Sequence, residues 1–344
     1  MANLMKASTE LFRRSPDERF ETLDQLYLHC QKERNASADR WHPPQALRPR
    51  MDDSRLTLTV NGCETLGLNH WSFGQLCTLC GINRETINRL SPETASRAFE
   101  ETLPTSTKPL QLLTLEASVI RSIHGVTYSR LWNSELLAML KDAAVDFEPP
   151  PKGFNGATGL YCGEQDLFTF LIDPGGWIDI GGQQFAPGFF AWNSEVGRRT
   201  LGIQAFWFQR ICQNHIVWDV ASDVVEFSRK HTGNIADSLG EIRRIIEALV
   251  TKRDARKDGF AALVKKAMAT NVGSSRDDAT KELLKYGITR DLVKRAVEKV
   301  AEDGKAFTLW NLVDALTQLT GAIQFAGDRM EADQKVAKLL AMAA

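Results

Sequence analysis

The stretch from Leu201 to Arg210 constrains the fold more than any other part of this chain. Its odd positions are apolar as far as Trp207, whereas its even positions mix Phe206 and Phe208 with polar side chains. This alternation predicts a β-strand with one buried face. Two interpretations of the second face stay open. Either it packs against a helix or a second subunit, or its rings form a platform on which nucleic-acid bases stack beside a cation.

A polar turn precedes this strand, and short strands punctuated by glycine surround it. Over residues 154–220 such strands favour an antiparallel meander. We interpret the turn as structural, and its residues are Asn193, Ser194, Glu195 and Gly197, followed by Arg198 and Arg199. An acid beside two arginines is expected to be ion-paired rather than to act as a general base.

The chain is predicted to be helical from Ser222 onward. An apolar stripe of coiled-coil type recurs there at spacings of four and three residues. Its members are Ile235, Leu239, Ile242, Ile246 and Leu249. Together with the surplus of aromatic rings, the stripe predicts a surface shared between subunits, in a homo-oligomer larger than a dimer that forms a ring or a filament. Residues 229–295 hold 16 Lys and Arg against 9 Asp and Glu, in a chain of net charge -1.

These patterns predict an α+β fold, in which an antiparallel β-meander is packed by helices. We expect an N-terminal helical and extended appendage over 1–53, a core over 54–270 and a C-terminal helical region over 271–344. Within the core, the meander covers 154–220 and the basic helix 222–270. No apolar run reaches membrane-spanning length, so no membrane partner is expected. The N-terminus lacks the pattern of a secretory signal, which favours reduced cysteines.

No pattern of catalytic or metal-binding residues is apparent. The phosphate-binding loop, the nucleophile elbow and the zinc-protease helix are all missing. Cys77 and Cys80 form the one Cys-x-x-Cys pair among six cysteines, and a zinc site would need two more ligands at matching spacing. A metal-dependent enzyme is an alternative if scattered residues converge, namely Cys212, His215, His231 and His124. We expect no enzyme activity, no cofactor and no metal, because scattered histidines are more often structural.

Six short motifs in a fixed order suggest a family. They are Asn69-His70-Trp71-Ser72-Phe73-Gly74-Gln75-Leu76, Val119-Ile120-Arg121-Ser122-Ile123, Asn193-Ser194-Glu195-Val196-Gly197, Arg210-Ile211-Cys212-Gln213-Asn214-His215, Arg229-Lys230-His231-Thr232-Gly233 and Phe307-Thr308-Leu309-Trp310-Asn311. Over residues 55–325 the chain resembles the phage/plasmid-like protein family, a bacterial family of unknown function (domain of unknown function nine-three-two) carried by mobile elements. It departs from the family at His215, where a glycine is usual. A meander followed by a helix is also similar, at the level of fold, to the single-strand annealing proteins of phages and of eukaryotic recombination.

The patterns and the resemblance together predict a single-stranded DNA-binding and strand-annealing protein of a phage or plasmid. It would act in recombination or DNA maintenance, in the cytoplasm of the bacterial host. Such binding needs cations along the phosphates and flat faces for the bases. The predicted contacts are Arg198, Arg199, Phe206, Phe208, Arg210, Arg229, Lys230, Arg243, Arg244, Lys252 and Arg253. The alternative is an interaction protein of a mobile element that inhibits a host defence by binding a host protein.

Overall fold

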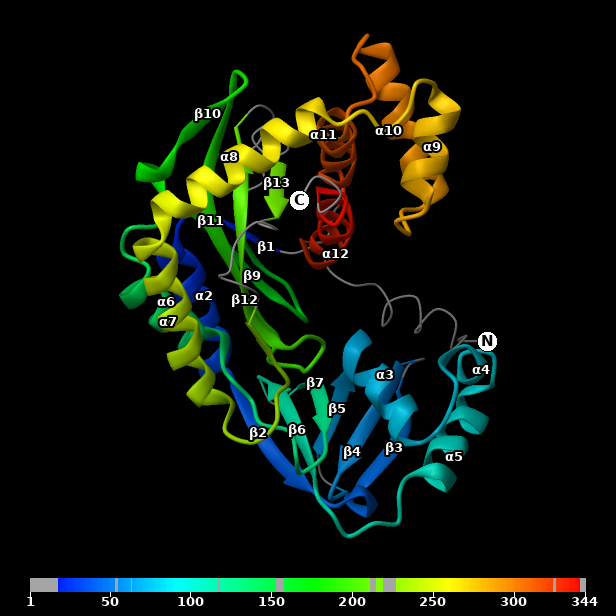
Figure 1. Cartoon of the computed structure of the whole chain (residues 1–344). Helices are drawn as coiled ribbons and strands as arrows, with labels where there is room; N and C mark the ends of the chain where they lie inside the picture. The colour runs from blue at the N-terminus through cyan, green and yellow to red at the C-terminus, as the bar shows by residue number, and fades with distance from the viewer. Residues whose placement is uncertain are drawn as a thin grey trace.

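The computed structural model of the chain has an α+β fold (Figure 1). Two β-sheets carry packed helices, and a helical region ends the chain. In Figure 1 the larger sheet runs through the upper left and centre, the smaller sheet lies below it, and the C-terminal helices lie at the upper right. The structure describes residues 18–52, 55–62, 64–116, 118–152, 158–210, 215–218, 227–323 and 326–340. No helix within these ranges is long and apolar enough to cross a membrane.

The larger sheet contains the antiparallel meander that the sequence predicts. Its main path runs in the order β1-β8-β9-β11-β12-β13, β10 pairs with β11, and β14 pairs with β12. Every one of these pairs is antiparallel. The strands are β1 Glu18–Phe20, β8 Leu160–Cys162, β9 Leu167–Ile172, β10 Ile178–Ile180, β11 Gln183–Asn193, β12 Leu201–Gln209, β13 His215–Trp218 and β14 Phe227–Arg229.

Strand β12 confirms the alternation in its sequence, and both of its faces are buried. Leu201 and Ile203 enter one hydrophobic core, and Trp207 continues the same face into a neighbouring core. Phe206 and Phe208 point to the opposite face and belong to a third core, made mostly of aromatic rings. The mixed face is therefore a packed sheet face, which is the first of the two interpretations.

Three helices cover the Leu201 side of the larger sheet, and they pack as neighbours with α6 between the other two. They are α2 Leu23–Asn35, α6 Asn133–Ala143 and α7 Ser238–Thr251. Figure 1 shows this layer on the left of the sheet.

The structure corrects two expectations about the basic helix. The predicted apolar stripe faces the chain's own sheet, with Ile242, Ile246 and Leu249 buried in the core, so this stripe does not supply a surface between subunits. The helix also begins at Ser238, because residues 227–229 form a strand instead. It breaks at Lys252, after which α8 Arg253–Ala269 begins.

The smaller sheet has the order β2-β6-β7-β5-β4-β3, and its one parallel pair joins β5 to β7. Helices α3 and α5 pack on it around a core of leucines, with Phe73 and Phe99 at its centre. Its strands are β2 Ser37–His42, β3 Leu47–Asp52, β4 Arg55–Val60, β5 Glu64–Leu68, β6 Leu110–Leu115 and β7 Val119–His124. Its helices are α3 His70–Leu79, α4 Arg84–Ile87 and α5 Pro92–Thr102.

Local signals in the sequence explain where these helices begin and end. Asn69 caps α3, because its side chain accepts from the Ser72 backbone N–H at 2.8 Å while the Ser72 hydroxyl accepts from the Asn69 N–H. Gly81 follows the helix at φ +66°, a conformation that other residues rarely adopt. Helix α5 begins at Pro92, and the Ser91 side chain before it accepts a hydrogen bond from the Thr94 backbone N–H.

The predicted N-terminal appendage is an integral part of both sheets in its described residues, 18–52. Strand β1 pairs with β8 in the larger sheet, and helix α2 packs on α6. Strands β2 and β3 form the two edges of the smaller sheet. Within it, Leu47–Asp52 is an extended edge strand that pairs with β4, and at an edge the missing N–H of Pro49 is tolerated.

The C-terminal helices pack on the end of the larger sheet. Phe260 of α8 stacks on Trp207 of β12, with ring centroids 4.3 Å apart, and Phe185 of β11 contacts Trp310. The described helices that follow α8 are α9 Arg276–Leu284, α10 Arg290–Glu302, α11 Leu309–Thr320 and α12 Ala326–Ala337. Three short 3-10 helices lie elsewhere, at Pro44–Ala46, Pro174–Gly176 and Ile235–Asp237.

Candidate functional site

The turn between β11 and β12 lies where the two sheets meet, and its side chains are buried. The Asn193 amide donates to the Leu131 carbonyl at 2.9 Å, and the Ser194 hydroxyl donates to the Gln165 carbonyl at 2.6 Å. Gly197 adopts φ +74°, and a Cβ there would lie 2.7 Å from the ring of His124. Only glycine both adopts this positive φ without strain and leaves room for the His124 ring. The interpretation of this segment as a structural turn therefore agrees with its geometry.

Glu195 is the centre of this turn, and its partner is not the arginine pair beside it in sequence. Its carboxylate accepts from the Arg121 guanidinium of β7 at 3.1 Å and from the Asn133 backbone N–H at 2.8 Å. Burial raises the pKa of Glu195, and the charge of Arg121 opposes that rise. Glu195 and Arg121 are 2% and 4% exposed, so this is a buried ion pair that joins the larger sheet to the smaller one.

A second arginine extends the charged network. Arg130 pairs with Asp39 of β2 at 2.7 Å and donates to the backbone carbonyl of Glu195. The Tyr128 hydroxyl donates to the same carbonyl at 2.9 Å. Residues far apart in sequence are thereby held around one turn.

Two histidines pack against the ring of Tyr128. The ring of His124 stacks on Tyr128 with centroids 3.6 Å apart, and His231 lies on the tyrosine at 5.5 Å. Burial, followed by the charge of Arg130, lowers the pKa of His124 to about 3. Burial also lowers the pKa of His231 to about 4. Both rings are therefore neutral at pH 7 and pack as aromatic rings, which matches the expectation of structural histidines.

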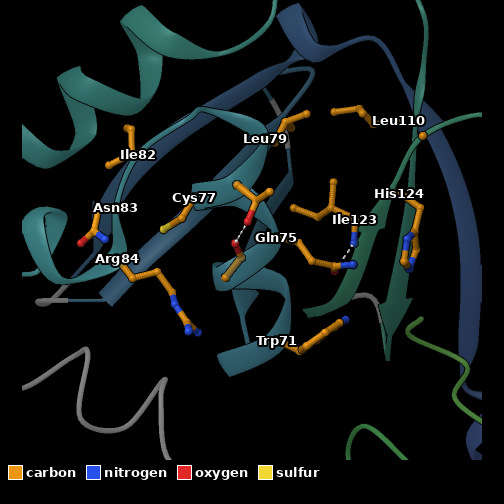
Figure 2. Close-up of a pocket in the computed structure, with 13 residues that line it drawn as sticks. Trp71, Gln75, Cys77, Leu79, Ile82, Asn83, Arg84, Leu110, Ile123 and His124 are labelled. Atoms are coloured by element: carbon orange, nitrogen blue, oxygen red, sulfur yellow. Dashed lines mark hydrogen bonds between the residues drawn. The ribbon is translucent and has the colours of Figure 1, made fainter. Parts of the chain in front are cut away.

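A pocket of about 650 Å³ opens beside this network, between α3, α4 and β7. Its volume is in the range of small-molecule sites. Trp71 lies between Arg84 and His124 in the view of Figure 2. Gln75 is fixed in the wall, because its side-chain oxygen accepts from the Ile123 backbone N–H at 2.8 Å (Figure 2).

Trp71 connects the pocket to the turn. Its indole N–H donates to the Val196 carbonyl at 2.6 Å, and the guanidinium of Arg198 lies 6.0 Å from its ring. None of the 13 lining residues is acidic, and Arg84 supplies a positive charge. The pocket thus offers a flat ring, one cation in its wall and no carboxylate among its lining residues.

The two predicted stacking residues lie elsewhere and are buried. Phe206 is 0% and Phe208 is 3% exposed. Phe206 contacts Phe170 edge to face, and Phe208 contacts Trp177 in the same manner. The expectation of a base-stacking platform on β12 is therefore corrected, because both rings are buried among other aromatic side chains.

The arginine pair after the turn is engaged by acids. Both guanidiniums contact the buried Asp166 carboxylate, Arg198 at 3.3 Å and Arg199 at 3.2 Å. Helix α12 adds Asp328, 3.6 Å from Arg198, and Glu331, 2.7 Å from Arg199. Acidic side chains thus occupy the positions that phosphates would take.

The remaining predicted cations do not gather into one groove. Arg210 and Arg229 lie at opposite ends of β12, about 30 Å apart along the strand, since Arg229 pairs with Leu201. Three others pair with acids: Arg243 with Asp142, Arg244 with Glu241 and Arg253 with Asp173. Lys230 and Lys252 are exposed and have no carboxylate partner among the described residues.

Of the residues that the sequence suggested for a metal, the structure brings His124 and His231 to the same tyrosine, but in the described ranges they form no group of three ligands. Cys77 and Cys80 are buried in the core of the smaller sheet, where burial raises the pKa of Cys77 to about 12. Cys212 and the side chain of His215 lie outside the described residues. One other group in the described part of the chain has metal-ligand atoms close together, namely His29, Glu33 and Cys162.

Sequence reasoning missed the residues around the pocket as a site. Trp71 and Arg121 occur in two of the short family motifs, and nothing in those motifs indicates that the Trp71 ring lies near Arg198. The capping signal at Asn69 is the one local pattern that places Trp71, because it fixes the first turn of α3.

Comparisons with known proteins identify no relative of this chain. No family model matches the chain, and neither the curated proteins nor the solved structures include a significant match. The functional argument therefore rests on the fold and on the geometry of the pocket.

Proposed function

We propose that this protein binds single-stranded DNA, with one base in the pocket beside Trp71. The observation that carries the proposal is the pocket itself, in which a partly exposed indole is accompanied by Arg84 and none of the 13 lining residues is acidic. Single-stranded nucleic acid requires this combination, because bases stack on flat rings while cations contact the phosphates.

The indole is prepared for stacking by its surroundings. The hydrogen bond from Trp71 to the Val196 carbonyl fixes the orientation of the ring, and α3 is fixed by its cap. A fixed ring loses little side-chain entropy when a base stacks on it. His124 is neutral, so it adds a polar edge without a charge.

The same geometry favours a single strand over a duplex. A base can enter a pocket of this size only after leaving its own stack, and in a duplex that step costs a few kcal/mol. A single strand presents unstacked bases at a lower cost. Affinity for single strands should therefore exceed affinity for duplex DNA of the same sequence.

The biological role that we propose is strand annealing during recombination or DNA maintenance of a phage or plasmid, inside the bacterial host cell. Annealing needs bases that are held and released for pairing, without a catalytic acid or base. A homo-oligomer would hold several such bases on one strand.

Titration of a fluorescently labelled oligonucleotide tests the proposal. We expect Trp71→Leu to weaken binding by about 5- to 150-fold, which corresponds to the 1–3 kcal/mol of one stacked base. Trp71→Phe keeps a flat ring and should retain most of the affinity. Because Phe and Leu both lose the bond to Val196, the comparison separates stacking from support of the fold.

Salt dependence provides the second measurement. Arg84→Gln should weaken binding and reduce the slope of log affinity against log salt by about 0.7, as expected for one lost phosphate contact on a single strand. Lys294→Gln removes one exposed charge from α10, far from the pocket in Figure 1, and should change neither quantity. Equal binding by Trp71→Leu and the wild type would contradict the proposal.

A further inference from the structure

A second cluster of reactive side chains lies on the other side of Arg121 from Glu195. Helix α2 carries His29 and Glu33 one turn apart, with Nε2 and Oε2 at 3.8 Å. Cys162, at the end of β8, places its Sγ so that the three ligand atoms all lie within 4.8 Å of one another. A nitrogen and an oxygen from helix α2 and a sulfur from strand β8 thus lie close enough together to bind one ion.

A fourth ligand atom lies next to this group. The Sγ of Cys30 is 3.8 Å from the Sγ of Cys162. Two thiolates on one tetrahedral zinc ion, each bound at about 2.3 Å, are also about 3.8 Å apart. The two sulfurs therefore already have the separation that a shared zinc ion requires.

We propose that His29, Glu33 and Cys162 bind a zinc ion, with Cys30 as the fourth ligand. Imidazole, carboxylate and thiolate are the ligands that proteins use for Zn²⁺, and two sulfurs make a hard ion such as Mg²⁺ a poor fit. Both cysteines are buried, whereas His29 and Glu33 are about one quarter exposed and leave a route for the ion to enter.

The charges around the cluster also suit a divalent cation. Glu33, Asp39 and Glu195 share two arginines, Arg121 and Arg130, and the Arg121 guanidinium is 4.0 Å from Glu33. Three carboxylates against two guanidiniums leave one negative charge beside the cluster. A zinc ion that binds as both thiols lose their protons adds no net charge, so the ion introduces no new unpaired positive charge at this junction.

Such an ion would join helix α2 to the larger sheet. It would also fix Glu33, which faces the arginine of the buried Arg121–Glu195 pair. We therefore assign the site a structural role, in which it stabilises the junction between the two sheets.

Metal analysis of the full chain, purified without an affinity tag and under reducing conditions, tests the proposal with zinc alone as the probe. We expect one zinc ion per chain after dialysis, and a melting temperature that falls when a chelator removes it. Replacement by cobalt should give the visible bands of a tetrahedral site and a thiolate-to-cobalt absorption.

Variants identify the ligands. His29→Gln and Glu33→Gln change partly exposed residues, and each should weaken zinc binding roughly tenfold or more. Cys162→Ser should weaken zinc binding and reduce the thiolate absorption, whereas Cys77→Ser, which changes a buried thiol in the smaller sheet, should retain zinc and the full absorption. Absence of stoichiometric zinc, equal zinc binding by His29→Gln and the wild type, or a Cys30–Cys162 disulfide in the reduced preparation would overturn the proposal.

Discussion

Replacing Glu195 with glutamine tests the claim that one buried ion pair holds the two sheets together. The substitution keeps the size of the side chain and its acceptor for the Asn133 N–H, but it removes the charge that faces Arg121 at 3.1 Å. The guanidinium is then left buried with Glu33 as its remaining carboxylate, at 4.0 Å. Stability should fall because an incompletely paired charge stays buried.

The expected size of this effect follows from the burial of both partners. Removing one member of a buried ion pair costs about 3–5 kcal/mol of unfolding free energy. We expect the lower end, about 3 kcal/mol, because Glu33 still offsets part of the charge. For a chain of 344 residues, that corresponds to a fall in melting temperature of about 4 °C.

A double-mutant cycle is the assay. Urea unfolding is measured for the wild type, Glu195→Gln, Arg121→Met and the double variant, and the double variant should lose less than the sum of the single losses. Glu101→Gln removes one partner of the exposed Arg97–Glu101 pair and serves as the control, with no expected change. Strictly additive losses, or a Glu195→Gln protein as stable as the wild type, would refute the reasoning.

Three further predictions concern the same region. Gly197→Ala should lower the unfolding free energy by about 2–4 kcal/mol in urea titrations, because its φ is +74° and its Cβ would lie 2.7 Å from the His124 ring; a loss below 1 kcal/mol would contradict this close packing. The pKa values of His124 and His231 are lowered from 6.5 to about 3 and about 4 in the native protein. As the pH drops from about 6.5 to 4, these histidines therefore bind protons in the unfolded chain but not in the native protein. The unfolding free energy should therefore decrease between about pH 6.5 and pH 4, by up to about 1.4 kcal/mol per pH unit for each histidine. His231→Gln should remove the contribution of that histidine to the decrease, and urea-unfolding midpoints measured across this pH range test it. Changing Asp328 to Asn together with Glu331 to Gln should raise the affinity for single-stranded DNA in the oligonucleotide titration, because these acids compete with phosphate for the two arginines after the turn; unchanged affinity would place those arginines outside the interface.

Much of the local structure follows from the sequence. The alternation along β12 predicts a strand, and the capping signal at Asn69 predicts the start of α3. These predictions succeed because each depends on residues within one turn or one strand. The amphipathic stripe around Ile242 likewise predicts a helix, although its partner is the chain's own sheet.

The partners of these elements could not be predicted, because they lie far away in sequence. Glu195 is next to Arg198 and Arg199 along the chain but pairs with Arg121, 74 positions away. The two sulfurs of the proposed zinc site are 132 positions apart. The even face of β12 was ambiguous for a different reason. Phe206 occurs equally on a buried sheet face and on a binding platform, and only the neighbouring rings decide between them.

Photochemical cross-linking to single-stranded DNA is the most direct test of the proposed function. An oligonucleotide carrying 5-iodo-deoxyuridine is irradiated with the full chain at low salt, and the attached peptides are identified by mass spectrometry. We predict that the label attaches within α3 at Trp71 or beside it at His124, and that Trp71→Leu removes this product. Attachment confined to α7 and α8, or no attachment under conditions where the oligonucleotide is bound, would contradict a base in the Trp71 pocket.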